Sequence, residues 1–194
     1  MLEKNIQTIA LYGGSFDPPH IGHEAIINAL LQLYYIDKVV VMPTYLNPFK
    51  ESSFAPANLR LAWLKKMFFF ETDVIVDDYE VTQNKKVPAI ESVKYLLQNH
   101  EKVYLVIGAD NLEKLHKWHK YDELKNLVTF IVASRQDIAI PANFIKIKID
   151  EEISSSELRE SMDTTKIPTR IKTEIIQYYK EKNWTTECKL SQMF

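Results

Sequence analysis

The stretch that decides the fold reads Gly13-Gly14-Ser15-Phe16-Asp17-Pro18-Pro19-His20-Ile21-Gly22-His23. It follows a short apolar run over 8–12 and precedes a helical pattern over 20–34, whose apolar residues recur on one face. The stretch therefore joins a strand to a helix. A helix that begins directly after a strand presents free backbone N–H groups and the positive end of its dipole, and both attract anions such as phosphate.

Apolar runs and helical patterns alternate along the rest of the chain. We expect further strands at 38–42, 74–76, 103–107, 128–133 and 144–149, and helices at 56–70, 88–99, 154–163 and 168–182. Continuous Val/Ile runs separated by helices indicate parallel strands that are covered on both faces. The sequence predicts an α/β fold with a doubly wound parallel sheet, which binds ligands beyond the carboxyl ends of its strands.

Length and composition limit the class of protein. The 194 residues, 46% hydrophobic and 26% charged, suit one globular domain, which we place at 1–183 with an irregular C-terminal tail at 184–194. A formal net charge of −2 gives no general basic field, so we expect no nucleic-acid partner. No apolar run reaches the roughly 18 residues of a membrane span, and the N-terminus lacks a secretory pattern. A lone cysteine, Cys188, excludes an intrachain disulfide, and we expect a cytoplasmic protein without membrane association.

Glycine is scarce, so its positions are informative. The chain has four glycines, and Gly22 stands between His20 and His23, which share one face of the first helical turn. Glycine costs a helix about 1 kcal/mol relative to alanine, so we expect some group to approach its backbone closely. Two imidazoles beside free N–H groups suit a polyphosphate. The alternative is a pair of surface histidines on a helix that Asp17 caps, with Pro18 in its first position.

The segment His-Ile-Gly-His resembles the signature of the HxGH nucleotidyltransferase superfamily, and residues 13–23 together resemble the bacterial nicotinate-nucleotide adenylyltransferases. The resemblance covers roughly residues 8–180 and implies a Rossmann-like nucleotidyltransferase fold with C-terminal helices. It implies transfer of the adenylyl group of ATP to nicotinate mononucleotide, giving nicotinate adenine dinucleotide and pyrophosphate in NAD biosynthesis. The implied cofactor is Mg²⁺ carried by the ATP phosphates, with no metal ligands from the protein.

The same resemblance assigns roles to residues at the strand ends. The catalytic residues are His20, His23 and Arg159. The ATP-binding residues are Gly13, Gly14, Ser15, Phe16, Gly22, Gly108, Asp110, Arg135, Ser154, Ser155 and Ser156, and the residues that bind nicotinate mononucleotide are Lys50 and Trp118.

Each assignment has a simpler structural alternative. Asp110 could be the N-cap of a helix over 111–115, and Trp118 could pack in the core. Ser154 with Glu157 forms a capping-box pattern, which is compatible with a phosphate site at the same helix N-terminus. The chain also departs from the family pattern: Phe49 stands where the family often has histidine, and residues 87–92 lack the usual Ser/Thr-Tyr-Thr pattern near the nicotinate.

Several alternatives stay open at this point. The acceptor could be nicotinamide mononucleotide or phosphopantetheine, although the phosphopantetheine enzymes usually have threonine in place of His20. Cytidylyltransferases are a further alternative within the superfamily. A non-catalytic nucleotide-binding regulator is the alternative from another class, and the complete set of motif residues argues against it. The sequence leaves open a homodimer and closure of the loop at 44–55.

Overall fold

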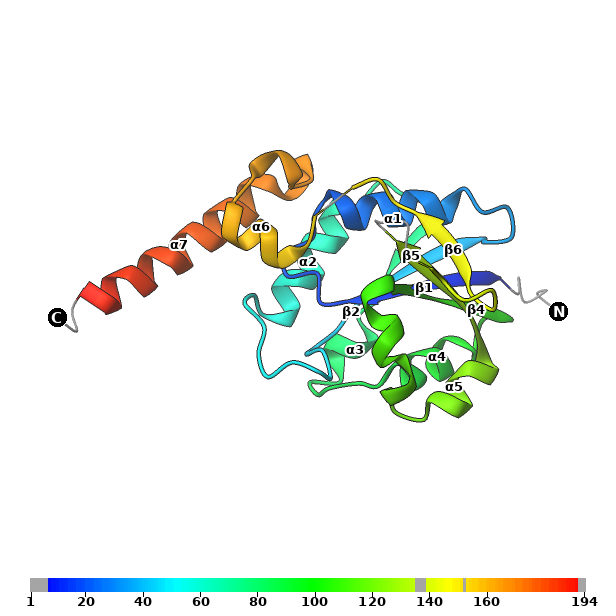
Figure 1. Cartoon of the computed structure of the whole chain (residues 1–194). Coiled ribbons are helices and arrows are strands. Elements are labelled where there is room, and N and C mark those ends of the chain that lie inside the picture. The colour runs from blue at the N-terminus through cyan, green and yellow to red at the C-terminus, as the bar shows by residue number, and fades with distance from the viewer. Residues whose placement is uncertain (1–6, 135–138, 152, 192–194) are drawn as a thin grey trace.

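The computed structural model describes residues 7–134, 139–151 and 153–191 (Figure 1). It contains one six-stranded sheet with the order β3-β2-β1-β4-β5-β6, in which every pairing is parallel. The strands are β1 Thr8–Gly14, β2 Lys38–Pro43, β3 Val74–Val76, β4 Lys102–Gly108, β5 Val128–Ser134 and β6 Ile145–Lys148. The predicted doubly wound parallel sheet is therefore confirmed.

Helices cover both faces of this sheet (Figure 1). On one face lie α1 Ile21–Leu31 and α2 Ala57–Met67. On the same side follow α6 Ser155–Ser161, η2 Thr164–Lys166, η3 Thr169–Ile171 and α7 Lys172–Ser191, and α7 packs through its first turns and then runs away from the sheet (Figure 1). On the other lie α3 Tyr79–Thr82, α4 Ala89–Leu96, η1 Ala109–Lys117 and α5 Tyr121–Leu127. None of the helices in the described ranges is long and apolar enough to cross a membrane.

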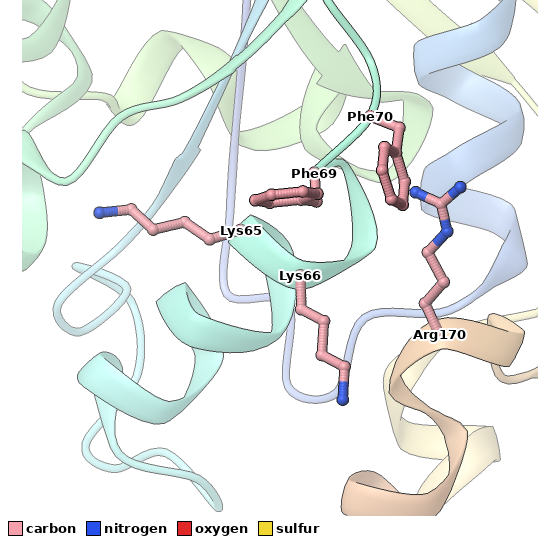
Figure 2. Close-up of a pocket in the computed structure, with 5 residues that line it drawn as sticks. All are labelled: Lys65, Lys66, Phe69, Phe70 and Arg170. Atoms are coloured by element: carbon pink, nitrogen blue, oxygen red, sulfur yellow. The ribbon is translucent and has the colours of Figure 1, made fainter.

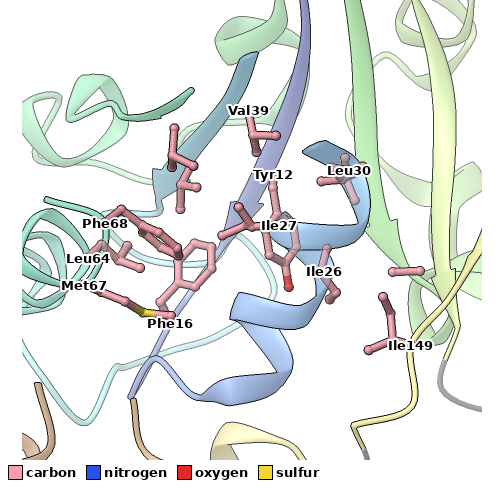
Figure 3. Packing of buried hydrophobic residues seen from close by; sticks show 14 of the residues in the cluster. Tyr12, Phe16, Ile26, Ile27, Leu30, Val39, Leu64, Met67, Phe68 and Ile149 are labelled. Carbon is pink, nitrogen blue, oxygen red and sulfur yellow. The ribbon is translucent and has the colours of Figure 1, made fainter. Parts of the chain in front are cut away.

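The buried hydrophobic residues form two clusters, one on each face of the sheet, because successive side chains of a strand point to opposite faces. In β1, Ala10 and Tyr12 join one cluster and Ile9 and Leu11 join the other, as the two-residue period of a strand requires. Figure 3 shows part of the first cluster, in which side chains of α1, of α2 and of the strands gather on one side of the sheet. Ile27 of α1 is fully buried there, and burial of such a side chain stabilises the fold by about 1.5–3 kcal/mol.

The strand order locates the ligand-binding edge. Strand order reverses direction between β1 and β4, which are neighbours in the sheet. The carboxyl ends of these two strands carry Gly14 and Gly108, so the two glycine-containing turns lie on the same edge. Open α/β sheets bind ligands at such a switch point.

Some helices differ from the sequence prediction. The pattern gave no indication of α3 or α5, because α5 buries only Leu124 among its seven residues and its apolar periodicity is weak. Helix α7 continues to Ser191, past residue 184, where the sequence analysis places the start of an irregular tail. The segment from Lys172 to Ser191 contains no Gly or Pro, so nothing in it interrupts helical hydrogen bonding.

Candidate active site

The turn from β1 to α1 brings the two histidines into direct contact. His20 is the N-cap of α1, and its backbone N–H donates to Nδ1 of His23 at 3.1 Å. The two rings stack with centroids 3.6 Å apart and planes 26° apart. Because Nδ1 of His23 accepts a hydrogen bond, the proton of the neutral ring lies on Nε2. His23 therefore presents a donor nitrogen from the first turn of α1.

Gly22 leaves little room for a side chain beside this pair. A Cβ atom at position 22 would lie 3.1 Å from the His20 ring and 3.1 Å from Cγ2 of Ile153. The group that approaches the glycine backbone is therefore the histidine ring, together with the residue that precedes α6. This explains the glycine without a ligand, and its predicted contact with ATP stays a prediction.

Asp17 does not cap α1, so that alternative for the motif was wrong. Its side chain is buried, and its two carboxylate oxygens accept from the N–H groups of Phe54 and Ala55 at 2.6 and 2.9 Å. The hydroxyl of Tyr179 in α7 also donates to this carboxylate at 2.6 Å. A buried carboxylate must be hydrogen-bonded, and here its partners come from two distant segments. Asp17 thus anchors the turn to the rest of the molecule.

Phe16 is likewise a packing residue. Its side chain is buried against Tyr12 and against the ring of His23, whose centroid lies 4.8 Å from that of Phe16. Its backbone has a positive φ of 48°, which is uncommon for a bulky residue and frequent at functional turns. Phe16 therefore offers a ligand its backbone only. Gly13, Gly14 and Ser15 beside it are exposed or half-buried.

The N-terminus of α6 docks on the same turn. Ser155 donates from its hydroxyl to the carbonyl of Pro18 at 2.9 Å, and Arg159 donates to the carbonyl of Asp17. Arg159 also donates to Oγ of Ser156 at 3.0 Å. The Ser154–Glu157 capping box is present, with both reciprocal bonds formed. A helix N-terminus, three serines and an arginine thus lie against the histidine turn, as a phosphate site requires.

The end of β4 forms the neighbouring part of the edge. Asp110 folds back over Gly108, where a Cβ atom would lie 2.3 Å from Oδ1 of Asp110. Gly108 is the N-cap of η1, so Asp110 is not the cap that the alternative expected. Asp110 is exposed, and Asn111 donates to its carboxylate at 3.3 Å. A side chain at position 108 would therefore displace the Asp110 carboxylate from this place, and in the chain as it stands that carboxylate is accessible to a ligand.

The remaining predicted residues lie on separate loops. Lys50 is exposed on the loop after β2, and Trp118 follows η1, where it packs partly against the second cluster. The loop of Lys50 contacts the segment before α4, because Lys86 donates to the carbonyl of Pro48 at 3.4 Å. Arg135 lies outside the described residues. The structure thus brings the β1–α1 turn that holds the histidines into contact with the α6 residues, and it shows no contact of Lys50 or Trp118 with them among the described hydrogen bonds; Lys50 follows β2 and Trp118 follows β4 and η1.

A matching family model and two close relatives now identify the family. A model described as cytidylyltransferase-like matches residues 11–161. A protein of Sulfurimonas denitrificans named "Probable nicotinate-nucleotide adenylyltransferase" is 57% identical over 182 residues, which cover 94% of this chain and 100% of that protein. A Campylobacter jejuni protein of the same name is 47% identical over 175 residues, covering 89% and 97%. This chain belongs to the nicotinate-nucleotide adenylyltransferases of the cytidylyltransferase-like family.

A solved structure supports the fold of this nucleotidyltransferase. The nicotinic acid mononucleotide adenylyltransferase of Plasmodium falciparum, in complex with NaAD, superposes with a TM-score of 0.72. The match has 21% sequence identity and covers 91% of this chain and 96% of that chain. The family and the Rossmann-like fold that the sequence predicted are thus confirmed, whereas the roles of individual site residues stay predictions.

The nucleotidyltransferase site offers few ligands for a metal ion of its own. Within the described residues, no three or more His, Cys, Asp or Glu side chains gather to hold one. The carboxylate of Asp17, in the histidine turn, is already engaged by Phe54, Ala55 and Tyr179. This donor set fits a Mg²⁺ ion that arrives on substrate phosphates, because Mg²⁺ commonly binds through phosphates with few protein ligands.

Sequence reasoning missed two buried polar groups. Arg60 of α2 is fully buried and donates to backbone carbonyls, and Glu80 of α3 is buried beside Ser92. One signal for Arg60 was available: it precedes Trp63, Leu64 and Met67 by three, four and seven residues, so it occupies a core-facing position of its helix. Glu80 gave no such signal, because α3 is too short for a pattern.

An open pocket of about 410 Å³ lies elsewhere on the molecule (Figure 2). Lys65, Lys66, Phe69, Phe70 and Arg170 line it, and Arg170 stacks on Phe70 with its Cζ 4.5 Å from the ring centroid. None of the predicted site residues lines this pocket. We therefore assign the candidate site to the strand ends, on the chemistry of the residues that meet there.

Proposed function

We propose that this chain transfers the adenylyl group of ATP to nicotinate mononucleotide, with nicotinate adenine dinucleotide and pyrophosphate as products. One observation carries the proposal: the Ser155 and Arg159 end of α6 is hydrogen-bonded to the turn that holds His20 and His23, at the switch point of the sheet. The 57% identity to a relative that bears this name supports the same reaction.

In this proposal the histidine turn binds the reacting phosphates. A phosphate oxygen of the mononucleotide attacks the α-phosphorus of ATP, and the bond from that phosphorus to the β-phosphate oxygen breaks. The attacking oxygen is already anionic, so no strong base is needed, and no covalent enzyme intermediate forms. The rate then depends on the in-line placement of two anions and on stabilisation of the charge that develops. His23 contributes its Nε2–H donor, and His20 lies stacked against it.

The other predicted residues hold the substrates. Ser155, Ser156 and Arg159 bind the β- and γ-phosphates, which leave as pyrophosphate, from the N-terminus of α6. Asp110 and Gly108 contact the ribose. Trp118 stacks on the nicotinate ring while nearby backbone amides bind its carboxylate. Lys50 reaches the phosphate of the mononucleotide. A Mg²⁺ ion that arrives with the phosphates would neutralise part of their charge.

Release of pyrophosphate tests the proposal. Purified protein is incubated with ATP and Mg²⁺ and with one of three acceptors: nicotinate mononucleotide, nicotinamide mononucleotide or phosphopantetheine. Fast release with the nicotinate form, and slow release with the other two, is the expected result. Preferred turnover of phosphopantetheine would overturn the acceptor. A folded protein that binds ATP and turns over none of the three would contradict the enzymatic function and favour the regulator.

A further inference from the structure

Arg60 joins the two ends of the loop at 44–55 to the turn that follows β1. Its guanidinium donates to the carbonyls of Thr44 and Tyr45 at the start of the loop, at 2.8 and 2.9 Å. It donates to the carbonyl of Ala55 at the end of the loop at 3.0 Å, and to the carbonyl of Ser15 at 2.6 Å. One planar group thus satisfies four backbone acceptors from three chain segments, which the fixed fork of arginine allows.

The end of this loop has a second anchor. Asp17 accepts from the N–H groups of Phe54 and Ala55, and Tyr179 donates to the same carboxylate. Tyr178 and Lys182 of α7 donate to the carbonyl of Phe54, and Arg159 stacks on the Phe54 ring with its Cζ 4.1 Å from the centroid. Helix α7 and the phosphate-side helix α6 therefore both contact the point where the loop re-enters the core.

Between these anchors the loop carries Lys50 into solvent. Asn47 organises a local turn there, since its side chain accepts from the N–H of Phe49 at 2.9 Å and its carbonyl accepts from the N–H of Lys50 at 2.9 Å. Lys50 and Phe49 are exposed. The position of Lys50 relative to Ser15 thus depends on the buried anchors at the two ends of the loop. A displacement of about 1 Å at a reacting centre can cost a hundredfold in rate.

We propose that Arg60 is a positioning residue for adenylyl transfer: its four backbone hydrogen bonds, together with those of Asp17, fix the loop at 44–55 against the histidine turn. That Arg60 affects the rate of adenylyl transfer rests on the proposed function. That Arg60 fixes the loop at 44–55 rests on the hydrogen bonds alone. Arg60 is fully buried, so it acts through the backbone and touches no substrate.

Hydrogen exchange tests the structural part directly. Arg60→Lys keeps the charge but cannot present a planar fork to four carbonyls, so amides over 44–55 are expected to exchange about 10-fold faster or more, while β4 amides are unchanged. Tyr179→Phe keeps the ring and removes one bond to Asp17, so faster exchange is expected at Phe54 and Ala55 alone. This second variant serves if Arg60→Lys fails to fold.

Steady-state kinetics test the consequence for catalysis. The Arg60→Lys enzyme is expected to lose about 10- to 100-fold in kcat/KM, with a larger rise in KM for nicotinate mononucleotide than for ATP because Lys50 moves with the loop. Leu124→Ala is the matched control, since Leu124 of α5 is fully buried in the other cluster. It lowers stability without altering the loop, so its KM values are expected to stay at the wild-type level.

The outcomes separate this inference from the proposed function. Folded Arg60→Lys and Tyr179→Phe proteins with wild-type exchange over 44–55 overturn the inference, whatever the activity. Faster exchange with unchanged kcat and KM in Arg60→Lys overturns the catalytic role. A wild-type protein without adenylyl transfer overturns the proposed function, while the exchange result still decides whether Arg60 fixes the loop.

Discussion

His20 and His23 constrain one another before any substrate binds. The backbone N–H of His20 donates a hydrogen bond to Nδ1 of His23. The His20 ring stacks on the His23 ring and packs against Gly22. Each ring therefore has little freedom to reorient. A donor that is fixed in advance costs no reorganisation when charge develops on a phosphate, and this is the usual source of large electrostatic effects in catalysis.

Replacement of His23 by alanine tests this role. We expect His23→Ala to lose about 10²- to 10³-fold in kcat, because a preorganised donor to the transferring phosphate is removed. Stability should fall by about 1–3 kcal/mol, because the N–H of His20 loses its acceptor and the ring contacts with His20 and Phe16 are lost. The control is His100→Ala, because His100 precedes β4 at the opposite edge of the sheet. Wild-type kcat in a folded His23→Ala enzyme would contradict the mechanism.

Addition of one methyl group at Gly22 probes the packing of the pair. The new Cβ would lie 3.1 Å from both the His20 ring and Ile153, so one of them must move. We expect Gly22→Ala to cost about 1–3 kcal/mol of stability, as overpacking does, and to lower kcat as well. Urea denaturation and steady-state assays measure the two effects. Unchanged kcat would show that the His20 ring can shift without consequence.

The residues that sequence reasoning misjudged are those whose partners lie far along the chain. Asp17 stands where a helix cap is expected, yet its partners are Phe54, Ala55 and Tyr179, which are 37, 38 and 162 residues away. Local pattern cannot specify such pairings. The histidines and glycines of 13–23 were predictable because a strand-to-helix turn at a sheet edge is a local motif. Their contact with ATP stays a prediction.

At the scale of elements, α6 supplies the serines and the arginine that complete the candidate site beside the histidine turn. The Ser155 hydroxyl and the Arg159 guanidinium attach the helix to carbonyls of the β1–α1 turn, and Leu158 packs it into the first cluster. The capping box at Ser154 sets where the helix begins, so its free N–H groups open toward the turn. Strands were predictable from their apolar runs, whereas α5 and α3 were not, because they bury few side chains.

Arg159→Lys tests the contribution of this helix. Lysine keeps the charge but loses the fork that contacts both Asp17 and Ser156, so we expect kcat/KM for ATP to fall about 10²-fold. The matched control is Arg170→Lys at the aromatic pocket of Figure 2, where the side chain stacks on Phe70. Equal activities for the two variants would remove Arg159 from the phosphate site.

For the whole molecule, the sheet and its two clusters supply the rigid frame, and the polar groups at the carboxyl edge supply the chemistry. The described structure is one sheet with helices on both faces. The domain limits, the cytoplasmic location, the absence of a nucleic-acid partner and the formation of a homodimer stay predictions. The helices around the sheet also bury polar groups: Arg60 of α2 and Tyr179 of α7 are hydrogen-bonded, whereas Glu80 of α3 has a partner for only one of its two oxygens. The stability of the fold therefore depends on how these groups are ionised.

Glu80 is the group whose ionisation should be most visible in the stability of the molecule. It is 5% exposed, Ser92 donates to its Oε1 at 2.7 Å, and its Oε2 has no hydrogen-bond partner among the described residues. Burial raises the pKa of Glu80 to about 7; Asp77 and Glu91 also raise this pKa, while the Ser92 bond opposes the shift. The folded protein thus binds a proton that the unfolded chain, with a pKa near 4.5, releases.

The sign of the pH dependence follows from this difference. The folded state is favoured by the protonated carboxyl, so this contribution to the free energy of unfolding is complete below about pH 4.5 and is lost as pH rises through about 7. Glu80→Gln keeps the acceptor for Ser92 and carries no charge. We expect it to be more stable than the wild type by about 2–3 kcal/mol at pH 8, and by little at pH 4.5. Urea denaturation at several pH values measures the difference in the free energy of unfolding, and Glu101→Gln, at an exposed position, is the control. A difference between Glu80→Gln and wild type that stays constant across this pH range would show that Glu80 stays ionised in the fold.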